Sequence, residues 1–277
     1  MVNLDVIIPV LMPSMHLSKL RSFLSNAPMD IRFNYVLDYS SEKVAEEEIF
    51  DAQPNERFFR GAFGSPGFSR NDGLDVCDSK YVCFWDVDDE PDVDQLLSMM
   101  NKFKNSKRDL AIGNWSYLER FDRPRGVSPR SVGNSPGLWR FAFKRELIGS
   151  LRFGSYRWGE DQLFLLQVFA KKPSVFTFDK IIYRYTRHSR GGLTTKHENV
   201  VDLAKVHGIW PKSLNKIEGN ARICFEVMYL KQVYSVAKYG GLKMTLKVLL
   251  KSYLLAPMSI FRNIVFIIFR LPKCNSW

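Results

Sequence analysis

Two kinds of hydrophobic pattern alternate over the first hundred residues of the chain. Continuous apolar runs are typical of strands buried on both faces, and apolar residues recurring every three or four positions are typical of helices packed on one side. The runs predict strands at 4–10, 33–37 and 81–85, and the periodic stretches predict helices at 17–24, 41–50, 69–76 and 92–103. This alternation predicts an α/β fold with a Rossmann-like, mostly parallel central sheet flanked by helices.

The patterns that follow are less regular. They predict strands at 110–115, 175–178 and 181–185, a helix at 160–169, and a long loop over 120–137 that is rich in Arg, Pro, Ser and Gly. From residue 221 onward the pattern is helical, and Lys243, Lys247 and Lys251 repeat every four positions on one side. We therefore expect an α/β domain over 1–199 and a helical appendage over 200–277.

Charge is distributed unevenly along the chain. The net charge is +11, and residues 200–277 contain 12 Lys and Arg against 3 acidic residues, a balance of +9. Such a segment favours a polyanion or an anionic membrane as its partner. Together with the apolar run at 260–270, it fits helices that lie on an anionic membrane surface. The alternative is that these helices pack on the first domain or dimerise and expose only their lysines.

The compartment is predicted from what the sequence lacks. The 4 cysteines show no paired spacing typical of a zinc site or a disulfide framework. No basic segment followed by an apolar one marks a secretory leader, and no uncharged apolar run is long enough to span a bilayer. We expect a cytoplasmic protein, peripheral on the inner face of the cell membrane.

Three carboxylates, Asp86, Asp88 and Asp89, directly follow the predicted strand 81–85. Open α/β sheets bind their ligands at the carboxyl ends of their strands. Clustered carboxylates are hard oxygen ligands for Mg²⁺ or Mn²⁺, which usually also hold a substrate phosphate. The alternative is a polar turn that leads into the next helix, with Asp92 as its N-cap.

Several ordered motifs carry a family resemblance. They are the opening strand 6–10, the turn at 37–42 with Asp38, the Arg-Asn-Asp-Gly-Leu stretch at 70–74, the Asp-Val-Asp-Asp stretch at 86–89 and the Glu-Asp pair at 160–161. In this order and spacing the chain resembles the family 2 glycosyltransferases of GT-A fold that build bacterial surface polysaccharides, over roughly residues 4 to 195. In the turn, Leu37 stands where the family has Asp, and Tyr39 where it has Gly.

The resemblance implies roles for individual residues. Pro9, Asp38, Arg70 and Asp86 would contact a nucleotide-sugar donor, expected to be UDP-linked. Asp86, Asp88 and Asp89 would hold Mg²⁺ or Mn²⁺.

On the acceptor side, Asp161 would be the general base of an inverting transfer to a saccharide or lipid-linked saccharide in surface polysaccharide or lipopolysaccharide synthesis. Two indoles, Trp139 and Trp158, are candidates for stacking on the acceptor sugar.

A phosphohydrolase and a nucleic-acid binder are the two alternative classes of protein. A metal-dependent phosphohydrolase would use Asp86 and Asp88 as nucleophile and acid, but such enzymes usually place this pair after the first strand. A nucleic-acid binder would account for the net charge of +11, yet clustered carboxylates repel phosphate unless a metal is bound. We therefore expect no nucleic acid partner.

Overall fold

The structure is a computed structural model that describes residues 4–12, 14–40, 51–118, 137–186 and 199–255, without the side chains of 220 and 251–255. The predicted helix 41–50, nearly all of the predicted loop 120–137 and the apolar run 260–270 lie outside these ranges. Contacts divide the chain into two compact units. The first contains residues 1–126, 138–155 and 174–187, and the second contains 127–137, 156–173 and 188–277.

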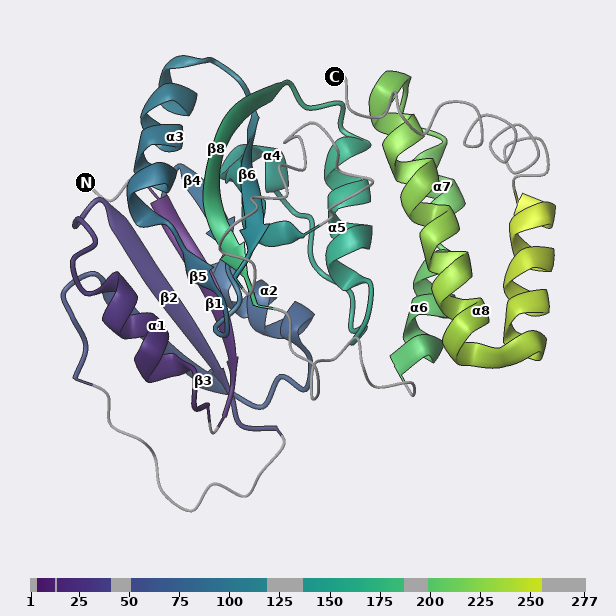
Figure 1. Ribbon diagram of the computed structural model, residues 1–277, viewed down its shortest axis with the longest axis horizontal. Coiled ribbons are helices and arrows are strands. Elements are labelled where there is room, and N and C mark those ends of the chain that lie inside the picture. The colour runs from purple at the N-terminus through teal and green to yellow at the C-terminus, as the bar shows by residue number, and fades with distance from the viewer. Residues whose placement is uncertain (1–3, 13, 41–50, 119–136, 187–198, 256–277) are drawn as a thin grey trace. The chain divides into compact units, whose positions relative to one another are not determined.

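The first unit is built on one eight-stranded sheet in the order β3-β2-β1-β4-β7-β6-β8-β5 (Figure 1). Its strands are β1 (Leu4–Leu11), β2 (Ile31–Asp38), β3 (Glu56–Gly61), β4 (Tyr81–Phe84), β5 (Glu90–Pro91), β6 (Leu110–Tyr117), β7 (Phe141–Lys144) and β8 (Val175–Tyr185). Strands β3, β2, β1 and β4 are mutually parallel, as are β6 and β8, whereas β7 and β5 run antiparallel to their neighbours. The predicted mostly parallel sheet is thus confirmed.

Helices cover both faces of this sheet. They are α1 (Leu17–Leu24), α2 (Pro66–Val76) and α3 (Val93–Asn105), with the short η1 (Leu138–Arg140) and α4 (Arg145–Ile148) further along the chain. Phe103 of α3 packs on Tyr81 at 5.3 Å between ring centroids, whereas Gly73 of α2 lies against Ile7 and Val36. Tyr81 and Ile7 belong to pairs three positions apart in the β1–β4 register, so they point to opposite faces. Figure 1 accordingly shows α2 behind the sheet and α3 in front of it.

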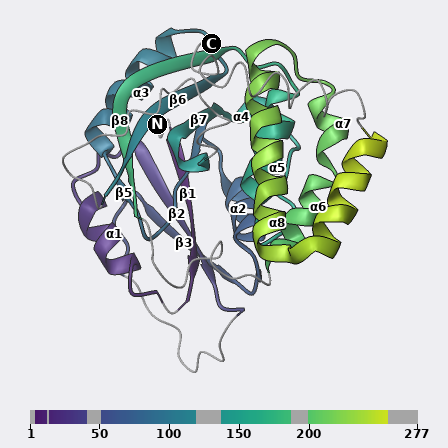
Figure 2. The same ribbon diagram turned by 45° about the vertical axis from the view of Figure 1, so that its right-hand side comes forward.

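The second unit is helical. It contains α5 (Glu160–Phe169), α6 (Val200–His207), α7 (Trp210–Leu214) and α8 (Gly219–Leu255). Helix α8 is kinked at Gly241, whose φ of 74° is the left-handed conformation that glycine adopts without strain. Figures 1 and 2 show α8 turning back at this point. Its two halves and α6 share one core of four buried residues: Val200, Leu203, Val236 and Val248.

The structure differs from the predicted elements at identifiable places. Helix α2 begins at Pro66 instead of residue 69, because Ser65 accepts a hydrogen bond from the Phe68 amide and proline suits the first helical position. Strand β3 was not predicted, since its Glu-Arg-Phe-Phe-Arg-Gly sequence has no clear alternation. The strands predicted at 175–178 and 181–185 form the single strand β8, with irregular register against β6.

Helices α6 and α7 were also not predicted. By contacts, they and α8 group with residues 156–173, which carry α5. The boundary between a catalytic domain and a C-terminal appendage at residue 199 stays a prediction. The two compact units are divided at other positions.

Candidate functional site

The carboxyl ends of β1, β2 and β4 lie at one edge of the sheet, because these strands are parallel. This edge receives Pro9 within β1, Asp38 at the end of β2 and Asp86 just after β4. Three of the predicted donor-binding positions therefore share one edge. It is where ligands bind in open α/β sheets.

Pro9 is a proline inside a central strand, where a missing N–H usually costs a sheet hydrogen bond. The Trp85 amide donates to the Ile7 carbonyl at 3.1 Å, so Ile7 directs its backbone groups toward β4. Pro9 directs its own to the same side, but the β1–β4 pairing ends at Ile7 and Phe84. The missing N–H at position 9 therefore removes no hydrogen bond from the β1–β4 pairing.

Asp38 is buried, and three backbone amides occupy its carboxylate. Oδ1 accepts hydrogen bonds from the amides of Ser40 at 3.0 Å and Phe63 at 2.9 Å, and Oδ2 accepts one from Gly64 at 3.0 Å. The side chain thus fixes the chain after β3 to the end of β2. Its predicted contact with the donor stays a prediction.

Arg70 and Asp86 are brought together by the fold. Arg70 is buried in α2, and its Nη2 donates to Asp86 Oδ1 at 2.9 Å. Its guanidinium carbon lies 5.6 Å from the centre of the Phe153 ring, a cation–π arrangement. The pair holds a guanidinium and a carboxylate in fixed orientation just beyond β4.

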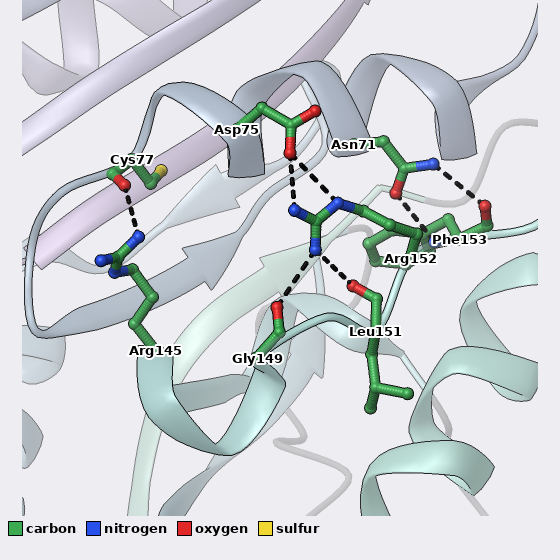
Figure 3. A network of polar contacts seen from close by, with 8 residues as sticks. All are labelled: Asn71, Asp75, Cys77, Arg145, Gly149, Leu151, Arg152 and Phe153. Atoms are coloured by element: carbon green, nitrogen blue, oxygen red, sulfur yellow. Dashed lines mark hydrogen bonds and ion pairs between the residues drawn. The ribbon is translucent and has the colours of Figure 1, made fainter.

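Asn71, the next residue of α2, holds Phe153 in place. Its Nδ2 donates to the Phe153 carbonyl at 3.0 Å, and its Oδ1 accepts from the Phe153 amide at 2.8 Å (Figure 3). The Phe153 ring packs edge-on against Phe84 at 5.2 Å. The Asn71 side chain therefore positions the ring that lies beside Arg70.

The same segment is fixed to α2 at two further points in Figure 3. Arg152 donates to Asp75 Oδ1 through Nε at 3.1 Å and through Nη2 at 2.6 Å. Arg145 donates to the Cys77 carbonyl at 2.9 Å. The Arg152–Asp75 pair is largely exposed, so it contributes little compared with the partly buried Asn71 contact.

Asp89 is in a different electrostatic situation. It is buried, and Oδ1 accepts a hydrogen bond from the Thr186 amide at 2.7 Å. Oδ2 is also buried and accepts no hydrogen bond from any residue that the structure describes. Burial, and then the charges of Asp86 and Asp88, raise the pKa of Asp89 to about 9. Within the ranges that the structure describes, Asp89 forms no ion pair that would offset its burial beside two other carboxylates.

The three carboxylates are suited to bind a divalent cation, because a cation would neutralise the buried Oδ2 of Asp89, which accepts no hydrogen bond from a described residue. Within the described ranges no three His, Cys, Asp or Glu side chains form a ready-made metal cage. Mg²⁺ commonly needs only one or two carboxylates together with substrate phosphates. We therefore keep Asp86, Asp88 and Asp89 as predicted ligands that would share the metal with a bound diphosphate.

Strand β8 contributes residues whose role at this site was not predicted. The hydroxyl of fully buried Tyr183 accepts a hydrogen bond from the Asp86 amide at 3.0 Å. The hydroxyl donates to the Asp86 carbonyl at 3.5 Å. It also acts on Asp89, because a side-chain interaction with Tyr183 partly offsets the rise in the pKa of Asp89 that burial and the neighbouring carboxylates cause. The Tyr-Arg-Tyr alternation at 183–185 was the only available signal, and it does not reveal a partner 97 residues away.

Both tryptophans proposed for the acceptor pack against tyrosines. Trp139 is buried and stacks on Tyr183 at 4.7 Å with an interplanar angle of 6°. This leaves little of its ring for a sugar, contrary to our expectation. In the second unit, partly buried Trp158 lies 5.9 Å from the Tyr239 ring.

Asp161 lies in the second unit, in the first turn of α5. Gly159 precedes this helix with φ of 89°, and a Cβ there would lie 3.1 Å from Leu203 of α6, so the turn requires glycine. Asp161 Oδ1 accepts from the Gln162 amide at 2.7 Å. Both Glu160 and Asp161 suit the positive end of the helix dipole, and the predicted role of Asp161 as base stays a prediction.

A partly buried chain of polar side chains links this turn to the C-terminal helices. Gln162 Oε1 accepts from Gln232 Nε2 of α8 at 2.8 Å, and Gln232 Oε1 lies 3.3 Å from His207 Nδ1. His207 is buried and stacks on Tyr229 at 3.8 Å. The helix that carries Asp161 is thus held by α6 and α8.

Solved structures share the fold of this chain. The S. aureus protein TarS, residues 1–349 in complex with UDP-GlcNAc, is 14% identical with a TM-score of 0.67, covering 86% of this chain and 73% of that one. The mannosyltransferase PcManGT from Pyrobaculum calidifontis, in complex with GDP-Man and Mn²⁺, is 14% identical with a TM-score of 0.56, covering 94% and 82%. At these identities the likeness shows the fold alone. No curated protein matches the sequence.

The family follows from the sequence itself. The model of glycosyl transferase family 2 matches residues 19–158, which include Asp38, Arg70 and the three carboxylates at 86–89. The match covers half of the chain, and the chain belongs to this family. It is a nucleotide-sugar-dependent glycosyltransferase, and the phosphohydrolase alternative is set aside.

Proposed function

We propose that this protein is an inverting, metal-dependent transferase that moves a sugar from a UDP-linked donor to a saccharide or lipid-linked saccharide. The observation that carries the proposal is the carboxylate group after β4: Asp86 oriented by Arg70, beside Asp89 with an uncompensated buried oxygen. A site of this kind is suited to a cation and a diphosphate.

Each side chain has a distinct task in the proposed reaction. Asp86, Asp88 and Asp89 would hold Mg²⁺ or Mn²⁺, which supplies positive charge against the diphosphate when bound. Arg70, held by Asp86 and Phe153, would supply a fixed positive charge to the phosphate oxygens. Asp38 would hold the backbone around the nucleotide base in place.

The proposed transfer is a single displacement. The acceptor hydroxyl oxygen forms a bond to the anomeric carbon from the face opposite the diphosphate, and the bond from that carbon to the phosphate oxygen breaks. The hydroxyl proton passes to the Asp161 carboxylate, a general-base contribution of about 10²–10⁴-fold. The nucleoside diphosphate leaves with the bonding electrons. Because the hydroxyl attacks from the opposite face, the configuration at the anomeric carbon inverts.

The acceptor and the location are proposed from the C-terminal charge. A balance of +9 over residues 200–277 favours an anionic membrane surface, and this would bring the enzyme to lipid-linked acceptors of surface polysaccharide or lipopolysaccharide synthesis on the inner face of the membrane. Among the described helices none is long and apolar enough to cross a bilayer.

The decisive experiment is a thermal-shift panel of nucleotide sugars with and without Mn²⁺, followed by a transfer assay on the stabilising donor. A ligand at about 100 times its Kd should stabilise the protein by about 2.7 kcal/mol. We expect Asp88→Ala to abolish the part of the shift that depends on Mn²⁺, and Asp161→Asn to keep the shift but lose transfer. An Asp88→Ala protein that responds to Mn²⁺ like the wild type would refute the metal site.

A further inference from the structure

The second half of α8 carries three distinct stripes of side chains. Met244 and Val248 pack into the core shared with α6 and the first half of α8. Leu242, Leu246, Leu249 and Leu250 are exposed by 75%, 56%, 42% and 60%. At 3.6 residues per turn these four leucines fall within an arc of about 100°.

The lysines lie beside the leucines. Lys243 and Lys247 are exposed and occupy the arc next to the leucine stripe, between it and the core-facing side. Because Val248 and Met244 are fixed in the core, the helix cannot rotate to bury its leucines. An apolar stripe with adjacent lysines, held outward by the fold, is the pattern of a helix that lies in a membrane interface.

We infer that this leucine stripe is a docking surface for an anionic lipid bilayer. The leucines would enter the headgroup and acyl boundary, and Lys243 and Lys247 would contact anionic headgroups. The biological role of this docking rests on the proposed function, because a lipid-linked acceptor would lie in the membrane.

Charge argues against the other occupants. Two copies joined by their leucine stripes would bring lysines together, and the half of α8 that carries the stripe has no acid to pair them, because no acidic residue follows Glu226. For the same reason, residues 256–277 carry no charge that could neutralise Lys243 and Lys247. An anionic surface supplies the complementary charge.

The test is co-sedimentation of the full chain with vesicles of phosphatidylcholine alone or mixed equally with phosphatidylglycerol, without donor or acceptor. We expect binding to the mixed vesicles that falls at least about 100-fold in the Leu242→Gln, Leu246→Gln, Leu250→Gln triple variant. Lys243→Gln with Lys247→Gln should weaken binding about 30-fold.

The control is a triple glutamine variant at three exposed apolar residues of the first unit, Met15, Phe23 and Met29, and it should bind like the wild type. Substitutions are preferred to deletion of α8, because Phe225 and Gln232 in its first half contact α5.

Several results would overturn the inference. They are equal binding by the leucine variant and its control, no binding of the wild type to mixed vesicles, or loss of binding only on substitution within 260–270. If light scattering showed that the wild type is a dimer and the leucine variant a monomer, the stripe would be an interface with a second copy. An inactive protein that still binds vesicles would refute the proposed function but not the docking surface.

Discussion

The turns after β2 and β4 both place a buried carboxylate at the carboxyl edge of the sheet, but the two carboxylates are compensated differently. The two carboxylate oxygens of Asp38 accept hydrogen bonds from three backbone amides. One carboxylate oxygen of Asp89 accepts a hydrogen bond from one backbone amide, and the other oxygen is buried without a hydrogen bond from any described residue. A compensated carboxylate stabilises the fold, whereas an uncompensated one costs stability unless a ligand completes it. Asp38 therefore stabilises the structure of the site, whereas Asp89 is suited to bind a cation.

The largest effect is expected for Asp89→Asn. Transfer should fall by about 10²–10³-fold, the usual loss when an electrostatic stabiliser is removed. The free energy of unfolding without metal should change little at neutral pH, where the raised pKa of about 9 keeps Asp89 mostly protonated. It should rise above that pH, where the substitution removes a buried charge beside Asp86 and Asp88. Urea unfolding and a transfer assay measure the two quantities. The exposed helical Asp94→Asn is the control, and a clear loss of stability for Asp89→Asn would contradict the comparison.

Asp38→Asn should show the opposite balance. The new amide nitrogen would face a backbone N–H at Phe63 or Gly64, so one of these donors loses its acceptor. We expect a loss of about 1–3 kcal/mol in the free energy of unfolding. Urea unfolding beside Asp89→Asn gives the direct test, and equal stability of the two variants would remove the distinction between the turns.

Glu56 at the start of β3 is a third, compensated acid. Burial alone would raise its pKa, but the hydrogen bonds from Arg21 and the Gln53 amide outweigh burial and lower it. Glu56→Gln should therefore cost about 1–2 kcal/mol at neutral pH.

Because the folded pKa of Glu56 lies below the unfolded one, its contribution is present above pH about 4.3 and is lost as the pH falls through the folded pKa. Wild type and Glu56→Gln should converge in stability in acid. A constant difference across the pH range would show that packing, and not ionisation, is responsible.

The smallest effect tests the position of Arg70. Asn71→Ala removes the two hydrogen bonds that hold Phe153 beside Arg70. We expect the KM for the donor to rise about tenfold, equivalent to one oriented hydrogen bond. Arg152→Gln is the matched control, because it breaks the exposed pair with Asp75 on the same segment and should leave KM unchanged. A lower unfolding temperature with unchanged KM would make Asn71 purely structural.

Much of the fold could be predicted because the signals are local. The buried runs gave β1, β2 and β4, and helix α1 has the predicted bounds. Strand β3 was not recognised because its side chains alternate weakly, and it became a strand through pairing with β2. The start of α2 was predicted three residues late, because the periodic stretch that indicates this helix begins after the Ser65–Pro66 cap.

For the site, the sequence identified which acids lie at strand ends but not their surroundings. The lysine repeat of α8 was likewise visible, yet periodicity alone does not show which of the apolar residues between the lysines are buried. In the structure Met244 and Val248 enter the core while Leu249 is exposed. Which residues of a helix are buried depends on the neighbour it packs against, here α6.

The sequence by itself determined the strands, the order of the motifs and the family, because periodicity and motif spacing are properties of neighbouring residues. Only the tertiary structure decided that Asp38 is satisfied by Phe63, 25 residues away, and that Asp89 receives a single amide from Thr186, 97 residues away. It also decided that α5 belongs with the C-terminal helices and that the leucines of α8 face outward. The compensation of a buried charge and the burial of a helix face depend on partners distant in the chain, and local sequence does not specify them.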